Sequence, residues 1–316
     1  MEREILLHGA SIFFFLFVLL KGSDFFLEGA VAIAERLSIH PYWIGITVVS
    51  IGTSLPELAA SVAGILKGTP AIMVGTVVGS NVVNLALVAG VGILIRPLDS
   101  WSRREAIAMA SMVIASLALW GVSFFSTVPH WVGVVMLLFY ALYLFVLKGE
   151  PEEKAEGEEE ERHNITPLRV LLWIAGLAMV ILGSNRAVEH ALKLAEILRV
   201  NSGFIALIII SVGTSLPELG VTITSAAKGH GEIMLGNVVG SNVANILLIS
   251  GLSFTFAKVG VSPTIRTIAI PYMVAVAIAF MLMCRIKRRL SRLDGAILLI
   301  TYIIFLILSF TYLTGG

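Results

Sequence analysis

The chain has 316 residues, of which 57% are hydrophobic and only 14% are charged, and its mean hydropathy is +0.94. Soluble domains carry about 25% charged residues, so this composition excludes a water-soluble domain and indicates a polytopic membrane protein. The net charge of +1, with no basic patch interleaved with aromatic residues, excludes nucleic acid as a partner. The single cysteine, Cys284, has no partner for an internal disulfide, and the six histidines are too scattered for a transition-metal cluster.

Ten apolar segments are long enough to cross a bilayer, which takes about 20 residues per helix. The first and the sixth exceed what a perpendicular crossing needs, so they are expected to tilt or protrude. The N-terminus reads Met-Glu-Arg-Glu, which lacks the positive region of a secretory signal, so the first segment is expected to stay in the fold. In chain order, the predicted spans are 5–36, 41–67, 71–96, 104–125, 129–148, 167–198, 202–228, 231–257, 264–284 and 293–314.

The sequence repeats itself at a constant offset of 161 positions. Residues 52–58 read Gly-Thr-Ser-Leu-Pro-Glu-Leu and return unchanged as residues 213–219. The match needs no insertion between residues 22 and 245, and a repeat of this length is the size of half a transporter rather than of a solenoid unit. The other matched positions include 77–82 with 238–243, Asn84 with Asn245, and Glu28 with Glu189.

Each repeat contains five predicted spans, which is an odd number, so the two repeats must enter the membrane with opposite orientations. The sequence therefore predicts an all-α polytopic membrane protein with ten transmembrane helices in two inverted five-helix repeats. The first repeat is residues 1–148, with its motif region at 41–96, and the second is residues 167–316, with its motif region at 202–257. Residues 149–166 form the linker between them.

The charge of the loops predicts the orientation, because cytoplasmic loops are enriched in Lys and Arg. With the N-terminus outside, the inner loops hold 14 Lys and Arg residues against 5 on the outer side, which favours N-out and C-out. The linker is then cytoplasmic, and it holds 8 of the 21 acidic residues. Because blocks of like charge stay extended and this one lacks the residue spacing of an EF-hand, a solvated linker is favoured over a Ca²⁺-collecting segment.

The repeated Gly-Thr-Ser-Leu-Pro-Glu motif places a carboxylate, Glu57 or Glu218, inside an apolar span. Such a charge costs about 2.5–3.5 kcal/mol even on the mildest scale and therefore marks a functional site. Pro56 has no N–H and crowds the preceding turn, so the helix is expected to break near mid-membrane and to free backbone carbonyls there. The second copy supplies the same groups from the opposite direction, which predicts one ion site built from both halves.

Hard cations bind such clusters of oxygen atoms, and Ca²⁺ takes about six to eight of them. The two glutamates supply the negative charge, and nearby hydroxyls and amides supply neutral oxygens. Positions 80 and 84 share one helical face and can point toward the carboxylates, as can 241 and 245. The amides at positions 81 and 242 fit interhelical hydrogen bonding as well as ion contact. The neutral candidates are Thr53, Ser54, Ser80, Asn81, Asn84, Thr214, Ser215, Ser241, Asn242 and Asn245.

Other polar groups in the spans have structural interpretations. Asp24 lies close to Lys21 in the sequence and is interpreted as an ion-paired structural group. Glu28 and Glu189 lie toward helix ends and are interpreted as interfacial. The two Gly-x-x-x-Gly pairs, at 75–79 and 236–240, fit close packing of helices through small residues.

Paired Gly-Thr-Ser-Leu-Pro-Glu segments, each followed by a Gly-Ser-Asn-x-x-Asn stretch, resemble the Ca²⁺/cation antiporter superfamily and most closely its prokaryotic Na⁺/Ca²⁺ exchangers. The resemblance covers essentially the whole chain. It implies that both glutamates bind Ca²⁺, helped by the backbone carbonyls of Thr53 and Thr214. It also implies that Na⁺ uses carbonyls near Ser50 and Ser211 and the hydroxyls of Thr53, Ser54, Ser80, Thr214, Ser215 and Ser241. The first and sixth helices would slide against the other eight to alternate access.

The expected function is secondary antiport of Ca²⁺ against Na⁺ across the cell membrane, without a cofactor or an obligate protein partner in the lipid bilayer. Asn245 stands where K⁺-dependent relatives carry Asp, which argues for K⁺-independent, electrogenic exchange, and Thr-Ser in the motif favours Na⁺ over H⁺. Exchange of H⁺ for Ca²⁺ at the same glutamates and a passive cation channel remain alternatives. An intramembrane hydrolase using Ser54 or Ser215 is a further alternative, although neither motif segment carries a His to act as base.

Overall fold

A computed structural model of the chain describes residues 2–37, 39–66, 71–99, 102–148, 167–198, 211–287 and 289–314. The described residues are mostly helical, because helices satisfy every backbone hydrogen bond within one segment where water is excluded. A pair of two-residue strands joins two of the loops. The acidic linker predicted at 149–166 lies outside the described residues, so its conformation stays a prediction.

The first half consists of one long helix, a broken segment, a bulged segment and two further helices. Short π-helical stretches, labelled η, interrupt the broken and bulged segments. The elements are α1 (Glu2–Leu37), α2 (Pro41–Ile44), η1 (Gly45–Val49), α3 (Ser50–Thr53), α4 (Leu55–Leu66), α5 (Ala71–Val82), η2 (Val83–Val88), α6 (Ala89–Ile95), β1 (Leu98–Asp99), α7 (Arg103–Val122) and α8 (His130–Lys148).

The second half follows the same order. It too begins with a long helix, continues with a broken and a bulged segment, and closes with two helices. The elements are α9 (Pro167–Ile197), α11 (Ser211–Thr214), α12 (Leu216–Lys228), α13 (Gly231–Val243), η4 (Ala244–Ile249), α14 (Ser250–Phe256), η5 (Ile265–Ala269), α15 (Ile270–Ile286), β2 (Arg289–Leu290) and α16 (Arg292–Thr314).

The sequence repeat reappears as a repeat of local structure. The π-helical turns η2 and η4, and the helices α6 and α14 that follow them, begin and end 161 residues apart. The short helices α3 and α11, which precede the motif prolines, keep the same offset. The backbone therefore breaks and bulges at matching points of both halves, although the inversion of the halves in the membrane stays a prediction.

Among the described residues, eight helices are long and apolar enough to cross a membrane. A ninth span is counted if the bent pair Pro41–Thr53 and Leu55–Leu66 is taken as one. Part of the span predicted at 202–228 lies outside the described residues, so the count of ten stays a prediction. The chain is a helical protein with several membrane-spanning segments.

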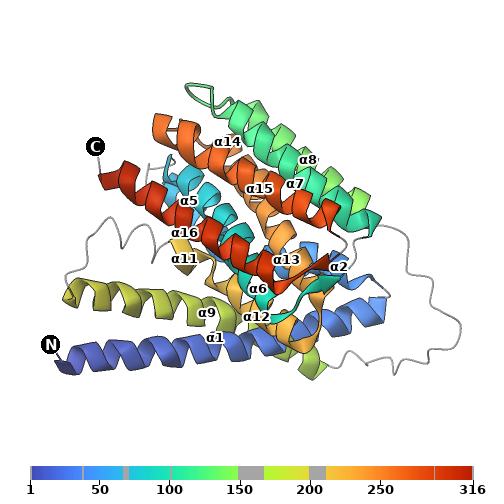
Figure 1. Ribbon diagram of the computed structural model, residues 1–316, viewed down its shortest axis with the longest axis vertical. Coiled ribbons are helices and arrows are strands. Elements are labelled where there is room, and N and C mark those ends of the chain that lie inside the picture. Colours follow the sequence, from blue (N-terminus) through green and yellow to red (C-terminus); the bar gives the residue numbers. More distant parts are fainter. Residues whose placement is uncertain are drawn as a thin grey trace, which may run out of the picture.

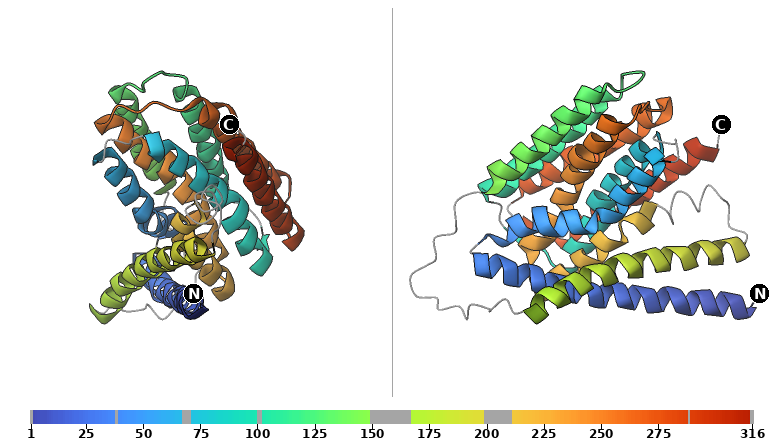
Figure 2. Two further views of the ribbon diagram at one scale, coloured as in Figure 1. Left: turned by 90° about the vertical axis from the view of Figure 1, so that its left-hand side faces the viewer. Right: turned by 180° about the vertical axis from the view of Figure 1, so that it is seen from behind.

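Helices α1 and α9 lie side by side along one face of the molecule and cross the other long helices obliquely (Figures 1 and 2). They contact each other far more than they contact any other element. Helix α1 begins and α16 ends at one end of the molecule, whereas α8 ends and α9 begins at the opposite end (Figure 1). This arrangement agrees with a linker on the opposite side of the membrane from both termini.

Glycines allow close approach at two of the helix crossings. A Cβ atom on Gly22 of α1 would lie 2.8 Å from the carbonyl oxygen of Gly176 of α9. A Cβ atom on Gly236 of α13 would lie 2.7 Å from the carbonyl oxygen of Tyr42. Small residues therefore set the spacing at both crossings, as the second Gly-x-x-x-Gly pair predicts.

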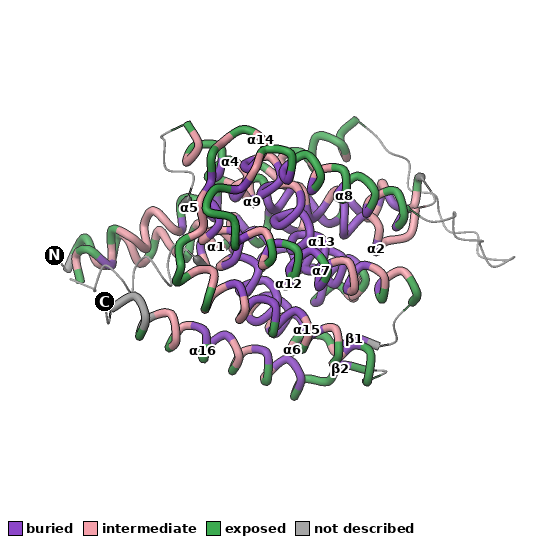
Figure 3. The backbone as a smooth tube through the Cα atoms, turned by 90° about the horizontal axis from the view of Figure 1, so that it is seen from above, coloured by how far each residue is buried: buried purple, intermediate pink, exposed green. Residues whose placement is uncertain are grey.

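The bulged segments form the centre of the molecule. We compare the most apolar 18-residue window of each span. In Gly231–Phe256, 94% of this window is buried, and in Met73–Ile95 72% is buried, whereas only 11% is buried in α1. Figure 3 shows the buried residues gathered around α12 and α13, with exposed residues on the outer helices. The centre thus holds both stretches predicted to supply amides and hydroxyls to an ion site.

Candidate cation site

Both motif copies break their helix at the serine that lies two residues before the proline. Helix α3 ends at Thr53, and Ser54 leaves the helical conformation with φ −85° and ψ 7°. Ser215 has nearly the same geometry, with φ −93° and ψ 8°. The two segments around Ser54 meet at 44°. The break is the one expected from the motif proline, because proline has no N–H to donate and crowds the turn before it.

The break places Glu57 in the first turn of α4 and Glu218 in the first turn of α12. Both side chains are 0% exposed. The N-terminus of a helix carries partial positive charge, which favours a carboxylate there. The Ser54 hydroxyl, three residues before Glu57, bonds to the Glu218 carboxylate, so the structure brings together the two motif copies that lie 161 residues apart.

Hydroxyl groups from both halves surround the carboxylates. The Ser54 hydroxyl donates a hydrogen bond to Glu218 Oε1 at 2.9 Å, which joins the first motif to the second. The Ser80 hydroxyl donates to Glu57 Oε1 at 3.4 Å. Two matching hydroxyl pairs also cross between the halves, Thr53 with Ser241 at 3.5 Å and Thr214 with Ser80 at 3.1 Å. The pairs are related by the same offset of 161 as the repeat.

A buried polar layer lies between the two bulged segments. It contains four asparagines, namely Asn81 of α5, Asn84 of η2, Asn242 of α13 and Asn245 of η4. Asn81 Nδ2 donates to the carbonyl oxygen of Asn242 at 3.3 Å, and Asn245 Nδ2 donates to Asn81 Oδ1 at 3.0 Å. Asn84 and Asn245 lie in the π-helical turns η2 and η4, which often occur at functional sites. The interhelical hydrogen bonding considered for position 81 is therefore present, whereas the amide of Asn242 donates to the carbonyl oxygen of Val238 in its own helix. Asn84 is left with both side-chain atoms free among the described residues.

Several buried oxygen atoms here accept no hydrogen bond from any described residue. They include one oxygen of each carboxylate, Glu57 Oε2 and Glu218 Oε2. Buried polar atoms in folded proteins are nearly always paired, so a cluster of unpaired acceptors calls for an electropositive partner. Carboxylate, hydroxyl and amide oxygens are the ligands of hard cations. The unpaired acceptors are Glu57 Oε2, Glu218 Oε2, Asn84 Oδ1, Ser215 Oγ, Asn242 Oδ1 and Asn245 Oδ1.

The remaining candidates fall at the edges of this cluster. The carbonyl oxygen of Ser50 accepts from the hydroxyls of Thr53 and Ser241, at 3.2 and 3.4 Å. Ser50 therefore lies beside the cluster, as the resemblance implies. Ser211 is the first residue of α11, and its side chain lies outside what the structure describes.

Sequence reasoning missed Asn237. This asparagine of α13 is 0% exposed and contacts Thr53, Thr222 and the main chain of Glu218. Its counterpart in the first repeat is Thr76, so a comparison that seeks identical residues passes over it. The signal that identifies it is the departure from the repeat at a position one turn before Ser241.

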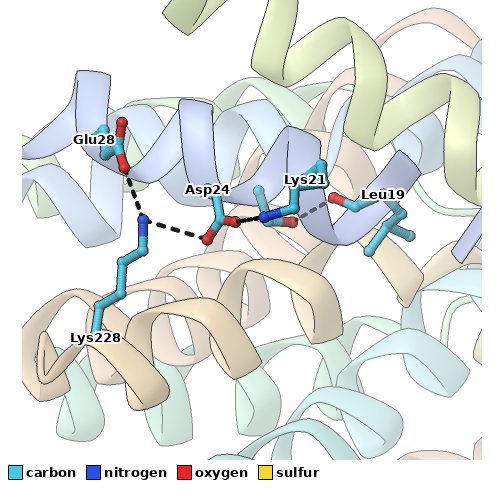
Figure 4. A network of polar contacts seen from close by, with 6 residues as sticks. Leu19, Lys21, Asp24, Glu28 and Lys228 are labelled. Atoms are coloured by element: carbon cyan, nitrogen blue, oxygen red, sulfur yellow. Dashed lines mark hydrogen bonds and ion pairs between the residues drawn. The ribbon is translucent and has the colours of Figure 1, made fainter. Parts of the chain in front are cut away.

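Charged residues on α1 form a second polar region, separate from the buried cluster. Lys228, at the end of α12, lies 3.3 Å from Asp24 and 2.8 Å from Glu28, and Lys21 lies 3.4 Å from Asp24 (Figure 4). All four side chains are at least partly exposed. Asp24 is thus the ion-paired group that its sequence neighbours predict, with Lys228 as an additional partner.

Two features bear on this second region. Burial, and after it the charge of Lys228, lowers the pKa of the neighbouring His230 imidazole and so disfavours its charged form. A cavity of about 280 Å³ lies alongside and is lined by Glu28, Glu35, Lys228 and His230 among others. Lys228 therefore supplies the positive charge that faces Asp24 and Glu28 across the α1–α12 contact.

Comparison with known proteins identifies the kind of molecule that carries this site. Residues 8–149 and 168–311 match the sequence profile of the family described as sodium/calcium exchanger protein. The chain belongs to the sodium/calcium exchanger family. The exchanger is similar to the sodium/calcium exchanger MaX1 of Methanosarcina acetivorans, with 30% identity over 92% of this chain and 95% of that protein.

Two further similarities extend over nearly the whole exchanger. The inner membrane protein YrbG of Escherichia coli is 30% identical over 89% of each chain. A solved structure of the sodium–calcium exchanger NCX_Mj superimposes with a TM-score of 0.81 at 28% identity, covering 95% of this chain and 98% of the other. The chain is therefore a transporter rather than an enzyme, which removes the hydrolase alternative, and its relatives support Ca²⁺ and Na⁺ as the transported ions.

Proposed function

We propose that the protein is a ten-helix secondary antiporter that moves Ca²⁺ against Na⁺ across the cell membrane by alternating access. The observation that carries the proposal is the pair of fully buried carboxylates, Glu57 and Glu218, each with one oxygen free of any described hydrogen-bond donor. A doubly negative pocket of this kind balances one Ca²⁺ or two Na⁺.

The site residues take different roles in this proposal. Glu57 and Glu218 bind Ca²⁺ together, with help from the carbonyls of Thr53 and Thr214. Na⁺ occupies neutral oxygen sites next to the carboxylates, formed by the hydroxyl pairs that cross between the halves. The ligand set also includes Ser50, Ser54, Asn81, Asn84, Ser211, Ser215, Asn242 and Asn245.

The α1–α9 pair is the element we propose to move. Its two helices contact each other extensively and cross the other long helices obliquely, so the pair is able to slide as one body. Repeats 1–148 and 167–316 are inverted, the termini lie outside, and the linker 149–166 lies in the cytoplasm. Sliding in the two directions opens the buried site alternately to the two sides.

The exchange is proposed to be electrogenic and independent of K⁺. Among the described residues, the buried cluster contains two carboxylates, Glu57 and Glu218, and position 245 carries Asn. With neutral oxygen sites for an additional Na⁺, three Na⁺ exchange for one Ca²⁺, and one net charge crosses the membrane per cycle. Each such charge is worth about 2.3 kcal/mol per 100 mV of membrane potential.

The test is Ca²⁺ flux into proteoliposomes under separately imposed gradients of Na⁺, K⁺ and H⁺. We expect an outward Na⁺ gradient to drive Ca²⁺ uptake, K⁺ to have no effect, and an imposed voltage to change the rate. Full uptake driven by a pH gradient without Na⁺, and insensitive to voltage, would establish H⁺/Ca²⁺ exchange in place of this proposal. Passive flux that no gradient can drive uphill would establish a channel.

A further inference from the structure

Two histidines that are far apart in the sequence meet where α1 contacts α9. His8 Nδ1 and His190 Nδ1 lie 2.8 Å apart, although 182 positions separate the two residues along the chain. Their ring centroids are 5.1 Å apart, and the ring planes are inclined at 47°. Both side chains are half-buried, so the pair is accessible from the surface. The histidines look scattered in the sequence, and only the packing of the two long helices brings this pair together.

The surroundings of the pair hold one ring in place and limit the positive charge nearby. Phe15 of α1 stacks on the ring of His190, with centroids 5.6 Å apart and planes inclined at 18°. The neighbouring cations on α9, Arg186 and Lys193, both donate to the carboxylate of Glu189 at 2.7 Å. This carboxylate neutralises one of the two positive charges, which lowers the repulsion that a cation bound at the imidazoles would meet.

The hydrogen bond between the two rings leaves their nitrogens suited to a metal ion. A neutral imidazole carries one N–H and one lone pair, so in this pair one Nδ1 donates and the other accepts. If the donating ring carries its proton on Nε2 instead, both Nδ1 lone pairs face the same space and both rings stay neutral. Neutral imidazole is the form that binds metal ions. A metal ion can therefore take the place of the shared proton without a change in the charge of either histidine.

The separation of the two nitrogens is close to what a shared metal ion needs. Zn²⁺ binds imidazole nitrogen at about 2.0–2.1 Å in tetrahedral geometry, so two nitrogens on one ion lie about 3.3 Å apart. The observed 2.8 Å has to widen by about 0.5 Å, which rotation of the side chains supplies without moving either helix. The described residues offer no group of three His, Cys, Asp or Glu side chains for a metal, so water completes the coordination and the ion exchanges readily.

We propose that His8 and His190 form a binding site for a late transition-metal ion such as Zn²⁺, which fastens α1 to α9 when it is bound. The inference goes beyond the proposed exchange, because the pair shares no residue with the buried oxygen cluster. The two sites also select different ions, since imidazole nitrogen suits Zn²⁺, Cu²⁺ and Ni²⁺, whereas carboxylate and carbonyl oxygens suit Ca²⁺. A metal ion between the rings adds a link between two helices that already contact each other extensively.

The test is titration of the purified, tag-free full-length protein with Zn²⁺ in saturating Ca²⁺, followed by calorimetry. We expect one Zn²⁺ per chain and a thermal midpoint raised by about 4 °C at a Zn²⁺ concentration 100 times Kd. His8→Gln and His190→Gln should each abolish both effects. Glutamine can still form a hydrogen bond at this contact, so either variant is expected to fold. With Cu²⁺ as the probe, electron paramagnetic resonance should show coupling to two imidazole nitrogens in the wild type.

The matched control is His130→Gln, which changes an exposed histidine whose Nδ1 contacts the main-chain carbonyl oxygens of Phe254 and Thr255. This variant should bind Zn²⁺ as the wild type does. Absence of Zn²⁺ binding in the wild type, or binding that survives in both His8→Gln and His190→Gln, would overturn the inference. Zn²⁺ that binds only when Ca²⁺ is absent would belong to the buried carboxylates and would overturn it as well.

Discussion

The acidic residues of the buried cluster and those of the α1 surface differ in what neutralises them. On α1, Asp24 and Glu28 face the ammonium group of Lys228 at 3.3 and 2.8 Å. In the cluster, Glu57 and Glu218 are fully buried, and their described partners are hydroxyls. A carboxylate with a resident lysine is already balanced, whereas one surrounded only by neutral oxygens requires a cation from outside. The contrast separates a structural ion network from a site for transported ions.

The largest effect should come from removing one buried charge. Glu57→Gln or Glu218→Gln should reduce Ca²⁺ transport to background, because one remaining carboxylate cannot balance a divalent ion in an apolar surrounding. Flux in proteoliposomes measures this, and size-exclusion chromatography verifies that each variant is folded. The matched control is Glu28→Gln on α1, which should retain most of the flux. Near-normal transport in either buried variant would contradict the assignment.

Removal of single hydroxyls should have an intermediate effect. Thr214→Ala or Ser80→Ala breaks the 3.1 Å pair that crosses between the halves and should weaken Na⁺-dependent flux by about tenfold, the usual worth of one buried hydrogen-bonding partner. The control is Ser61→Ala, which removes a buried hydroxyl of α4 that has no described partner. Equal losses in the control and in the site variants would mean that the crossing pair has no special role.

Disruption of the α1 network should cost less. Lys228→Met removes the charge shared by Asp24 and Glu28, and pairs as exposed as these contribute at most about 1 kcal/mol. We expect a small decrease in thermal stability and a transport rate within a few-fold of wild type. Abolished transport in a folded Lys228→Met variant would place the α1 network in the ion pathway and erase the distinction between the two regions.

The smallest effect is expected from the acidic linker. Replacing residues 150–161 with a neutral flexible sequence should leave the transport rate within a few-fold, because a block of like charges needs no packed partner. Ca²⁺ flux at saturating and at low Ca²⁺ measures this. Loss of transport with normal membrane insertion would show that the linker participates in the mechanism.

The features of the fold that repeat could be predicted from the sequence, whereas most of the contacts that do not repeat could not. The proline in each motif predicts the helix breaks at Ser54 and Ser215, and the offset of 161 pairs Glu57 with Glu218. The contact of Lys228 with α1 joins residues 200 positions apart. No local pattern predicts such a contact, because it depends on how two distant helices pack.

The detailed geometry of the site could not be predicted from the sequence either. Apolar periodicity does not distinguish an α-helix from one with a π-helical turn, so η2 and η4 were not foreseen, although they carry Asn84 and Asn245. Asn237 was missed because its contacts are with Thr53 and the main chain of Glu218, on two other helices. Those contacts exist only once three helices have packed together.

The most direct test of the central claim is equilibrium binding of radioactive Ca²⁺ to the purified protein. If Glu57 and Glu218 share one ion, the wild type should bind a single Ca²⁺ per chain, Na⁺ should displace it, and either Glu→Gln variant should lose it. A variant that still binds Ca²⁺ with wild-type stoichiometry and affinity would contradict the shared site. Two independent Ca²⁺ ions per chain, one lost with each glutamate, would contradict it equally.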